Sequence, residues 1–95
     1  MNNYILNGKI PIKCDNIILW AKWFEKVNRH VAETKKNNIT VSTIFLGMDH
    51  SFNSGEPLLF ETMIFGGEHD EKQWRYSTWE DAEIGHKQAC ELAGI

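Results

Sequence analysis

The chain has 95 residues, of which 42% are hydrophobic and 24% charged, and its formal net charge is −3. This length and balance fit one small globular domain and leave little room for a second. Binding of nucleic acid by charge needs clustered Lys and Arg, and Lys35-Lys36 is the only adjacent basic pair, so the composition argues against that class of partner.

Cysteine usage and apolar runs indicate the compartment. Cys14 and Cys90 are far apart and form no CxxC motif, so we expect two reduced thiols rather than a disulfide framework. The start of the chain has no basic segment followed by a long apolar one, and no apolar run is long enough to cross a membrane. The expectation is a single cytoplasmic domain over residues 1–95, with no membrane partner.

The first expected element is a β-hairpin within residues 3–13. Asn7-Gly8 lies between two short apolar runs, and this dipeptide is a strong signal for a two-residue turn with positive φ. Pro11 has no N–H to donate, so its strand is expected at a sheet edge or at a strand end.

An amphipathic helix should follow, with Asp15 as its N-cap. Apolar residues then recur at helical spacing from Ile17 to Val31, which predicts a helix of about 17 residues. Polar residues and turn formers at 34–38 end it.

Two central strands are expected next. Residues 39–46 are rich in β-branched side chains, and residues 58–65 form a second short apolar run, so the two should pair antiparallel. The connection at 47–57 is longer than an ordinary hairpin loop. Residues 74–76 are a candidate third strand.

The last expected element is a second helix. Ser77 and Glu80 have the spacing of a capping box, and Gly94 is a plausible stop. One stripe holds Trp79, Ala82, His86, Ala89 and Ala93. The chain therefore predicts an α+β fold of order ββαββ, an optional further strand and a final α, in which a small antiparallel sheet packs against two amphipathic helices.

The first candidate for chemistry is Asp49-His50, just past a strand end in the long loop. Long loops are often functional, and Asp with His suits phosphate or metal contacts or acid–base work. The competing interpretation is that Asp49 caps the turn and His50 is an ordinary exposed residue.

Glu61 and His86 are the other candidates. Glu61 lies among apolar strand residues, where burial of an unpaired carboxylate would be costly. It is therefore expected to be exposed to solvent, to have a function, or to pair with Arg75, His50 or His86. His86 falls on the apolar stripe of the second helix beside Gly85, whose position inside a helix would be explained by a close approach of backbone. Each also has a purely structural interpretation, an ion pair for Glu61 and a satisfied core histidine for His86.

These residues raise the question of metal and ligand. No HxH, HExxH or CxxC spacing is present, so a metal centre would have to be assembled in space from Asp49, His50, Glu61 and His86. Trp74, Tyr76 and Trp79 are expected to pack in the core or to form a stacking platform for a base or a nicotinamide ring. The N–H groups of Gly66-Gly67 or the second helix's N-terminus are candidate phosphate sites.

Three segments resemble a family of short proteins encoded by bacteriophages and prophages, whose activity is not characterised. They are VSTIFLGMDH at 41–50, PLLFETMIFGG at 57–67 and YSTWEDAE at 76–83, followed by Gly85-His86, and the resemblance spans nearly the whole chain. It implies a phage accessory protein that acts inside a bacterial cell, and a counter-defence role fits that class. It assigns no catalytic residue.

Three functions follow from these observations. The first is a binding protein, not an enzyme and without a cofactor, that forms a homo-oligomer and sequesters a nucleotide signal at a subunit junction. The second is a small metal-assisted hydrolase that uses Asp49, His50, Glu61 and His86. The third is an inhibitor that docks on a host protein complex.

Overall fold

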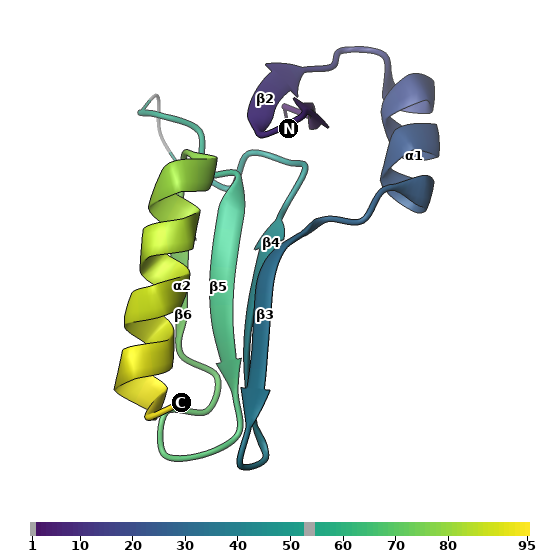
Figure 1. Cartoon of the computed structure of the whole chain (residues 1–95). Coiled ribbons are helices and arrows are strands. Elements are labelled where there is room, and N and C mark those ends of the chain that lie inside the picture. The colour runs from purple at the N-terminus through teal and green to yellow at the C-terminus, as the bar shows by residue number, and fades with distance from the viewer. Residues whose placement is uncertain (1, 53–54) are drawn as a thin grey trace.

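The computed structural model describes residues 2–52 and 55–95 and confirms the α+β class. The elements are β1 (Tyr4–Asn7), β2 (Ile10–Lys13), α1 (Ile17–Lys26), β3 (His30–Lys36), β4 (Ile39–Phe45), β5 (Phe60–Phe65), β6 (Gln73–Tyr76) and α2 (Trp79–Ala93). They form two parts, a four-stranded sheet covered by α2 and a smaller N-terminal unit, defined here as residues 4–26 (Figure 1).

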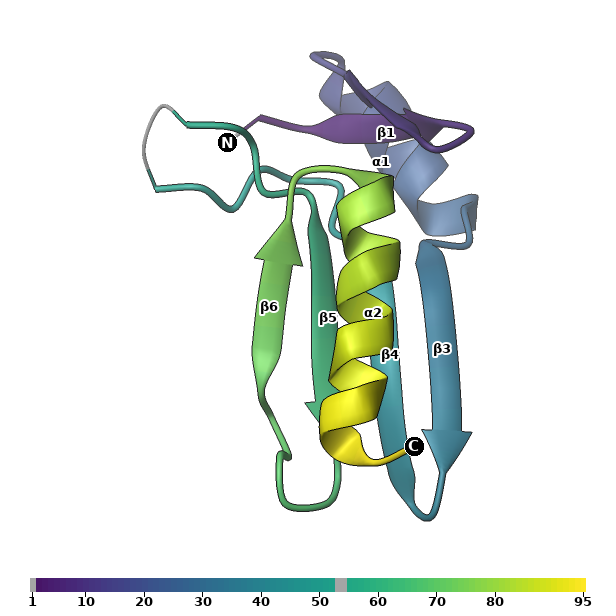
Figure 2. The same ribbon diagram turned by 60° about the vertical axis from the view of Figure 1, so that its left-hand side comes forward.

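The four-stranded sheet is an antiparallel meander in the order β3-β4-β5-β6, and α2 crosses one of its faces (Figure 2). Side chains alternate between the faces of a strand, so every second residue of β4 and β5 points at α2. The register pairs these residues across the two strands, and all six are fully buried. The pairs are Val41 with Ile64, Thr43 with Thr62, and Phe45 with Phe60.

The N-terminal unit consists of the β1-β2 hairpin and α1. The hairpin forms its own two-stranded sheet, and an isolated bridge between Asn3 and Met48 connects it to the segment after β4. Trp20 of α1 fastens the unit further, because its indole N–H donates to the carbonyl oxygens of Tyr4 at 3.0 Å and Gly47 at 3.1 Å. The predicted hairpin is confirmed, although its turn is Gly8-Lys9 rather than Asn7-Gly8, with Gly8 at φ +64°.

The predicted length of the first helix is wrong. α1 has ten residues, and Asn16 rather than Asp15 is its N-cap, accepting from the backbone N–H groups of Ile18 and Leu19. Val31 lies in strand β3, which the sequence pattern had assigned to helix and loop. Val31 happens to continue the helical spacing, whereas tertiary pairing with β4 decides its conformation.

The turn that follows β3 explains why this strand forms. Asn37 and Asn38 have φ of 54° and 65°, and they connect Lys36 to Ile39, which are paired. Two positive φ values in a two-residue loop define the turn that matches the twist of paired strands, and Asn tolerates that conformation. The Asn-Asn pair is therefore a hairpin signal, and it fixes the register of β3 on β4.

The second helix begins one residue later than predicted. Thr78 is its N-cap, because its hydroxyl accepts from the backbone N–H of Asp81 at 3.1 Å. Gly94 ends the helix in the left-handed conformation with φ 78°, as predicted. Among the described residues, no helix is long and apolar enough to cross a membrane.

Candidate functional site

A chain of buried polar side chains runs between α2 and the sheet. His86 of α2 is only 6% exposed, and its imidazole lies between two threonine hydroxyls. Its Nδ1 is 2.7 Å from the Oγ1 of Thr43, and its Nε2 is 2.9 Å from the Oγ1 of Thr34. The Thr43 hydroxyl is also 2.6 Å from that of Thr62, and a further hydrogen bond joins Thr62 to Tyr76.

This chain links all four strands of the sheet to α2. Burial lowers the pKa of His86, because the charged imidazolium would lose its hydration inside the protein. A neutral imidazole has one N–H and one acceptor nitrogen, and the two threonine hydroxyls satisfy both. His86 therefore acts as a hydrogen-bonded core histidine, the structural alternative that its place on the apolar stripe had suggested.

Tyr76 ends the chain at strand β6. Burial raises the pKa of its phenol, and the hydrogen bond with Thr62 offsets part of that rise. Gly85 of α2 lies directly against this phenol, and a Cβ added there would be only 2.1 Å from the Tyr76 hydroxyl oxygen. The predicted close approach at Gly85 is thus present, and its partner is an aromatic side chain rather than backbone.

A pocket of about 210 Å³ lies beside Tyr76, between β6 and α2. Trp74 and Tyr76 contribute aromatic walls from the strand, and Gln88 contributes an amide from the helix. The remaining lining residues are Gly85, Ala89 and Leu92. The pocket is mainly apolar with a few polar groups, as ligand sites usually are, although its volume is below the range of about 300–1,000 Å³ that is common for such sites.

The structure divides the three aromatics that the sequence had grouped. Trp74 and Tyr76 line the pocket, whereas Trp79 packs edge-on against the ring of Phe60 at 6.1 Å between centroids. The ammonium of Lys9 lies 5.8 Å from the Trp79 ring. The buried indole N–H of Trp79 has no hydrogen-bond partner among the described residues. Trp79 therefore belongs to the hydrophobic packing, and the aromatic walls of the pocket come from Trp74 and Tyr76 of β6.

Asp49 connects the two ends of the long loop through hydrogen bonds of its side chain. Its Oδ1 accepts from the backbone N–H groups of Ser51 at 2.8 Å and Leu58 at 3.0 Å, so it joins the two arms of the loop. The hydrogen bond from Ser51 is the main reason that the pKa of Asp49 is lowered. Phe52 beyond it is 99% exposed, and residues 53 and 54 of the predicted loop lie outside the described residues.

His50 and Glu61 lie apart from the polar chain. The backbone N–H of His50 donates to the carbonyl of Leu58, and the side chain is half-buried. Glu61 accepts from Nε of Arg75 at 2.9 Å, one of the partners considered from the sequence. Because Glu61 precedes Thr62 on β5, this ion pair lies on the sheet face opposite α2.

Features of the chain itself disfavour an anion at both expected phosphate sites. Gly66 and Gly67 both have positive φ, and the N–H of Gly66 donates to the carboxylate of Asp70. The first turn of α2 carries Glu80 and Asp81, whose negative charges oppose a bound anion.

The structure does not bring the four residues of the hydrolase hypothesis together. Glu61 and His86 lie on opposite faces of the sheet, and Asp49 is bonded within its loop. Within residues 2–52 and 55–95, no three His, Cys, Asp or Glu side chains gather in a way that could hold a metal ion. Cys14 and Cys90 are both free and half-buried.

Sequence reasoning missed the threonines and Gln88. Thr34, Thr43 and Thr62 point toward α2 from three adjacent strands, and polar residues at buried positions of a strand need partners. Thr43 is flanked at alternate positions by Val41 and Phe45, so the pattern contained a signal for a buried hydroxyl. Comparison with known proteins adds no assignment, because no family model, curated protein or solved structure matches the chain.

Proposed function

We propose that the chain is a small binding protein that holds a planar, nucleotide-like ligand and returns it unchanged. The observation that carries this proposal is the pocket between β6 and α2, with its walls from Trp74 and Tyr76 and the amide of Gln88. Aromatic faces stack on any nucleobase, and an amide can both donate to and accept from the edge of a base.

The candidate acid–base groups support binding over catalysis. The carboxylate of Asp49 accepts hydrogen bonds from two backbone N–H groups, and that of Glu61 is paired with Arg75. Both ring nitrogens of His86 are hydrogen-bonded to threonine hydroxyls. A general acid or base must reach the proton that it transfers, and these three groups are occupied by partners within the chain.

The size of the pocket bears on how a ligand would be held. About 210 Å³ suits one ring system, and a complete nucleotide is larger, so its sugar and phosphates would extend beyond Trp74 and Leu92. A second copy of the chain would provide surface for that part, which fits a ligand held at a subunit junction. In this proposal the protein is a phage accessory factor that sequesters a nucleotide signal in the bacterial cytoplasm.

A thermal-shift screen against nucleobases, nucleosides, and linear and cyclic nucleotides tests the proposal. A ligand present at about 100 times its Kd should stabilise the folded protein by about 2.7 kcal/mol, and mass spectrometry should recover it intact. Trp74→Ala and Gln88→Ala should reduce this stabilisation. Phe65→Ala is the matched control, because Phe65 is a comparably exposed aromatic, 46% against 37% for Trp74, on the other face of the sheet.

Three results would count against the proposal. The first is no stabilisation by any nucleotide at millimolar concentration. The second is equal loss of stabilisation in Phe65→Ala and Trp74→Ala, which would remove the pocket from the explanation. The third is conversion of the ligand, which would make the protein an enzyme.

A further inference from the structure

The N-terminal unit exposes an unusual amount of aliphatic side chain. Ile10 and Ile12 of β2 are 64% and 43% exposed, and Ile17, Ile18 and Leu19 in the first turn of α1 are 57%, 65% and 59% exposed. Residues 13–16 alone separate the two groups, so both lie at the same end of the molecule (Figure 1). We refer to residues 10–19 as the aliphatic surface.

The strand register explains why this surface faces outward. Ile10 and Ile12 alternate with Pro11, which pairs with Leu6. Leu6 and Tyr4 pack against the core cluster that includes Phe45 and Phe60, so this face of the hairpin is turned inward. Ile10 and Ile12 lie on the opposite face, where their side chains are largely exposed to solvent.

The N-terminal unit also lacks a core of its own. Among residues 2–40, all of them described, none is fully buried, and the first buried side chain is Val41. A two-stranded hairpin and a ten-residue helix are each marginal in water without packing on a hydrophobic face. The five exposed aliphatic side chains together offer on the order of several hundred Å² of apolar surface, a large part of the roughly 800 Å² that each partner of a stable complex buries.

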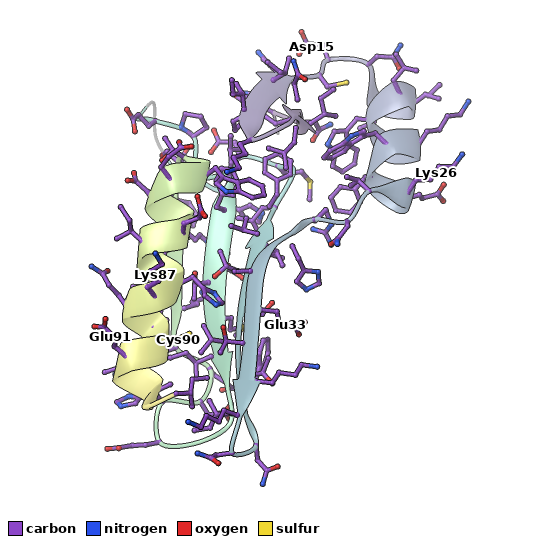
Figure 3. All side chains as sticks on the ribbon, in the orientation of Figure 1. Asp15, Lys26, Glu33, Lys87, Cys90 and Glu91 are labelled. Atoms are coloured by element: carbon purple, nitrogen blue, oxygen red, sulfur yellow. The ribbon has the colours of Figure 1, made fainter. Side chains whose placement is uncertain are left out.

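The charges favour a second copy of the chain as the partner. Within residues 10–19 the only charged side chains are Lys13 and Asp15, which lie 3.9 Å apart and neutralise each other. Figure 3 shows Asp15 at the outer end of the molecule. A neutral apolar surface can meet its own copy without repulsion between like charges, whereas it offers nothing that attracts a strongly charged partner. In a twofold dimer the same patch from each subunit forms the contact.

We propose that the aliphatic surface is the interface of a homodimer, in which residues 10–19 of one copy pack against the same residues of the other. This interface shares no residue with the proposed ligand pocket, so it is a second contact, separate from the subunit junction proposed around a bound ligand, and it is tested without ligand. A dimer completes the core that the N-terminal unit lacks.

Sedimentation velocity of the full chain, from low to high micromolar concentration and without ligand, tests the interface. The wild type should sediment as a dimer. The double variant Ile10→Glu with Ile18→Glu should sediment as a monomer with an unchanged circular dichroism spectrum, because both side chains are exposed in the single chain. Ile84→Glu is the control, since Ile84 is 56% exposed on α2, and it should stay dimeric.

A second measurement needs no variant. Hydrogen exchange of the wild type should slow in residues 10–19 as the protein concentration rises, with little change on α2. The proposal is overturned by a wild type that stays monomeric throughout, by an Ile84→Glu variant that dissociates as fully as the double variant, or by exchange that slows on α2 instead. Cosedimentation of the monomer with anionic lipid vesicles would also overturn it, because the surface would then seat on a membrane.

Discussion

The four-stranded sheet with α2 and the N-terminal unit differ in how completely their apolar side chains are buried. Between the sheet and α2, six paired side chains of β4 and β5 are buried, and a continuous polar chain joins His86 to the strands. In the N-terminal unit, no side chain of α1 is fully buried, and three residues of its first turn face solvent. The first part therefore contains fully buried core residues, and the second contains none.

This difference indicates which part of a small domain supplies most of its stability and which part leaves apolar surface exposed for association. A chain of this length buries only about two thirds of its unfolded surface, so it cannot enclose two cores. Most of the buried side chains lie between the sheet and α2. The N-terminal unit is held by the hydrogen bonds of Trp20, by the bridge at Asn3 and by packing of the inward face of β1 on the core. Four sets of measurements test this division, from the largest expected effect to the smallest.

Phe60→Ala should have the largest effect on stability. Phe60 is fully buried and packs on Phe45 at 5.3 Å between ring centroids, so its loss should lower the free energy of unfolding by about 3–5 kcal/mol. Phe24→Ala in α1 should cost roughly half as much, because Phe24 is only half-buried. Urea denaturation measures both values. Equal costs would show that the N-terminal unit is part of the main core.

Gly85→Ala should come next. An alanine inside a helix usually gains about 1 kcal/mol over glycine, but here its Cβ would lie 2.1 Å from the hydroxyl oxygen of Tyr76 and would force the ring out of place. We expect a net loss of about 1–3 kcal/mol in the free energy of unfolding.

A double-mutant cycle separates the two contributions at Gly85. In the background of Tyr76→Ala the clash is absent, so Gly85→Ala should become neutral or stabilising. If the substitution costs the same in both backgrounds, Tyr76 is not the reason for the glycine.

The free energy of unfolding should depend on pH through the protonation of His86. Its pKa is lowered in the folded protein, so below the ordinary value of 6.5 the unfolded chain takes up a proton before the folded one does. The free energy of unfolding is therefore highest above that value and falls as the pH drops toward the folded pKa, by at most about 1.4 kcal/mol per pH unit. His86→Gln should remove this part of the slope. An unchanged slope between pH 7 and 5, taken as roughly the window of histidine titration, would contradict it.

The smallest effects concern the start of α1. Asn16→Ala removes the cap that accepts from Ile18 and Leu19, and it should cost about 1 kcal/mol. Asp15→Ala removes only an exposed ion pair with Lys13, and it should change stability by less than about 0.5 kcal/mol. Chemical denaturation of the two variants decides which residue caps the helix, since the reverse order would assign the cap to Asp15.

Much of the fold could be predicted because its signals are local. The hairpin around Gly8, the strands at 39–45 and 60–65, and the stop of α2 at Gly94 each depend on a few neighbouring residues. Strand β3 could not be separated from the helix before it, because Val31 fits both the helical spacing and a strand. The Asn37-Asn38 turn was a local signal for this strand, and the pairing of β3 with β4 resolves the ambiguity.

The site was less predictable because it depends on contacts between distant segments. The sequence indicated that something approaches Gly85 closely and that Glu61 needs a partner, and Arg75 was among the residues considered. It could not indicate that Thr34 meets His86, which is 52 positions away. Nor could it show that alternation along β5 sends Glu61 to the face opposite His86, which separates two residues that seemed suited to one cluster.

The order of the strands also has a consequence for how the chain acquires its structure. In the β3-β4-β5-β6 meander every strand pairs with its neighbour along the chain, so the sheet can assemble through successive local contacts. The hydrogen bond between Thr34 and His86, by contrast, joins the first of these strands to a helix residue 52 positions further along the chain. We therefore expect the strands to pair first and the apolar face of the sheet to stay open until α2 packs on it, so that docking of α2 is the step that closes the core.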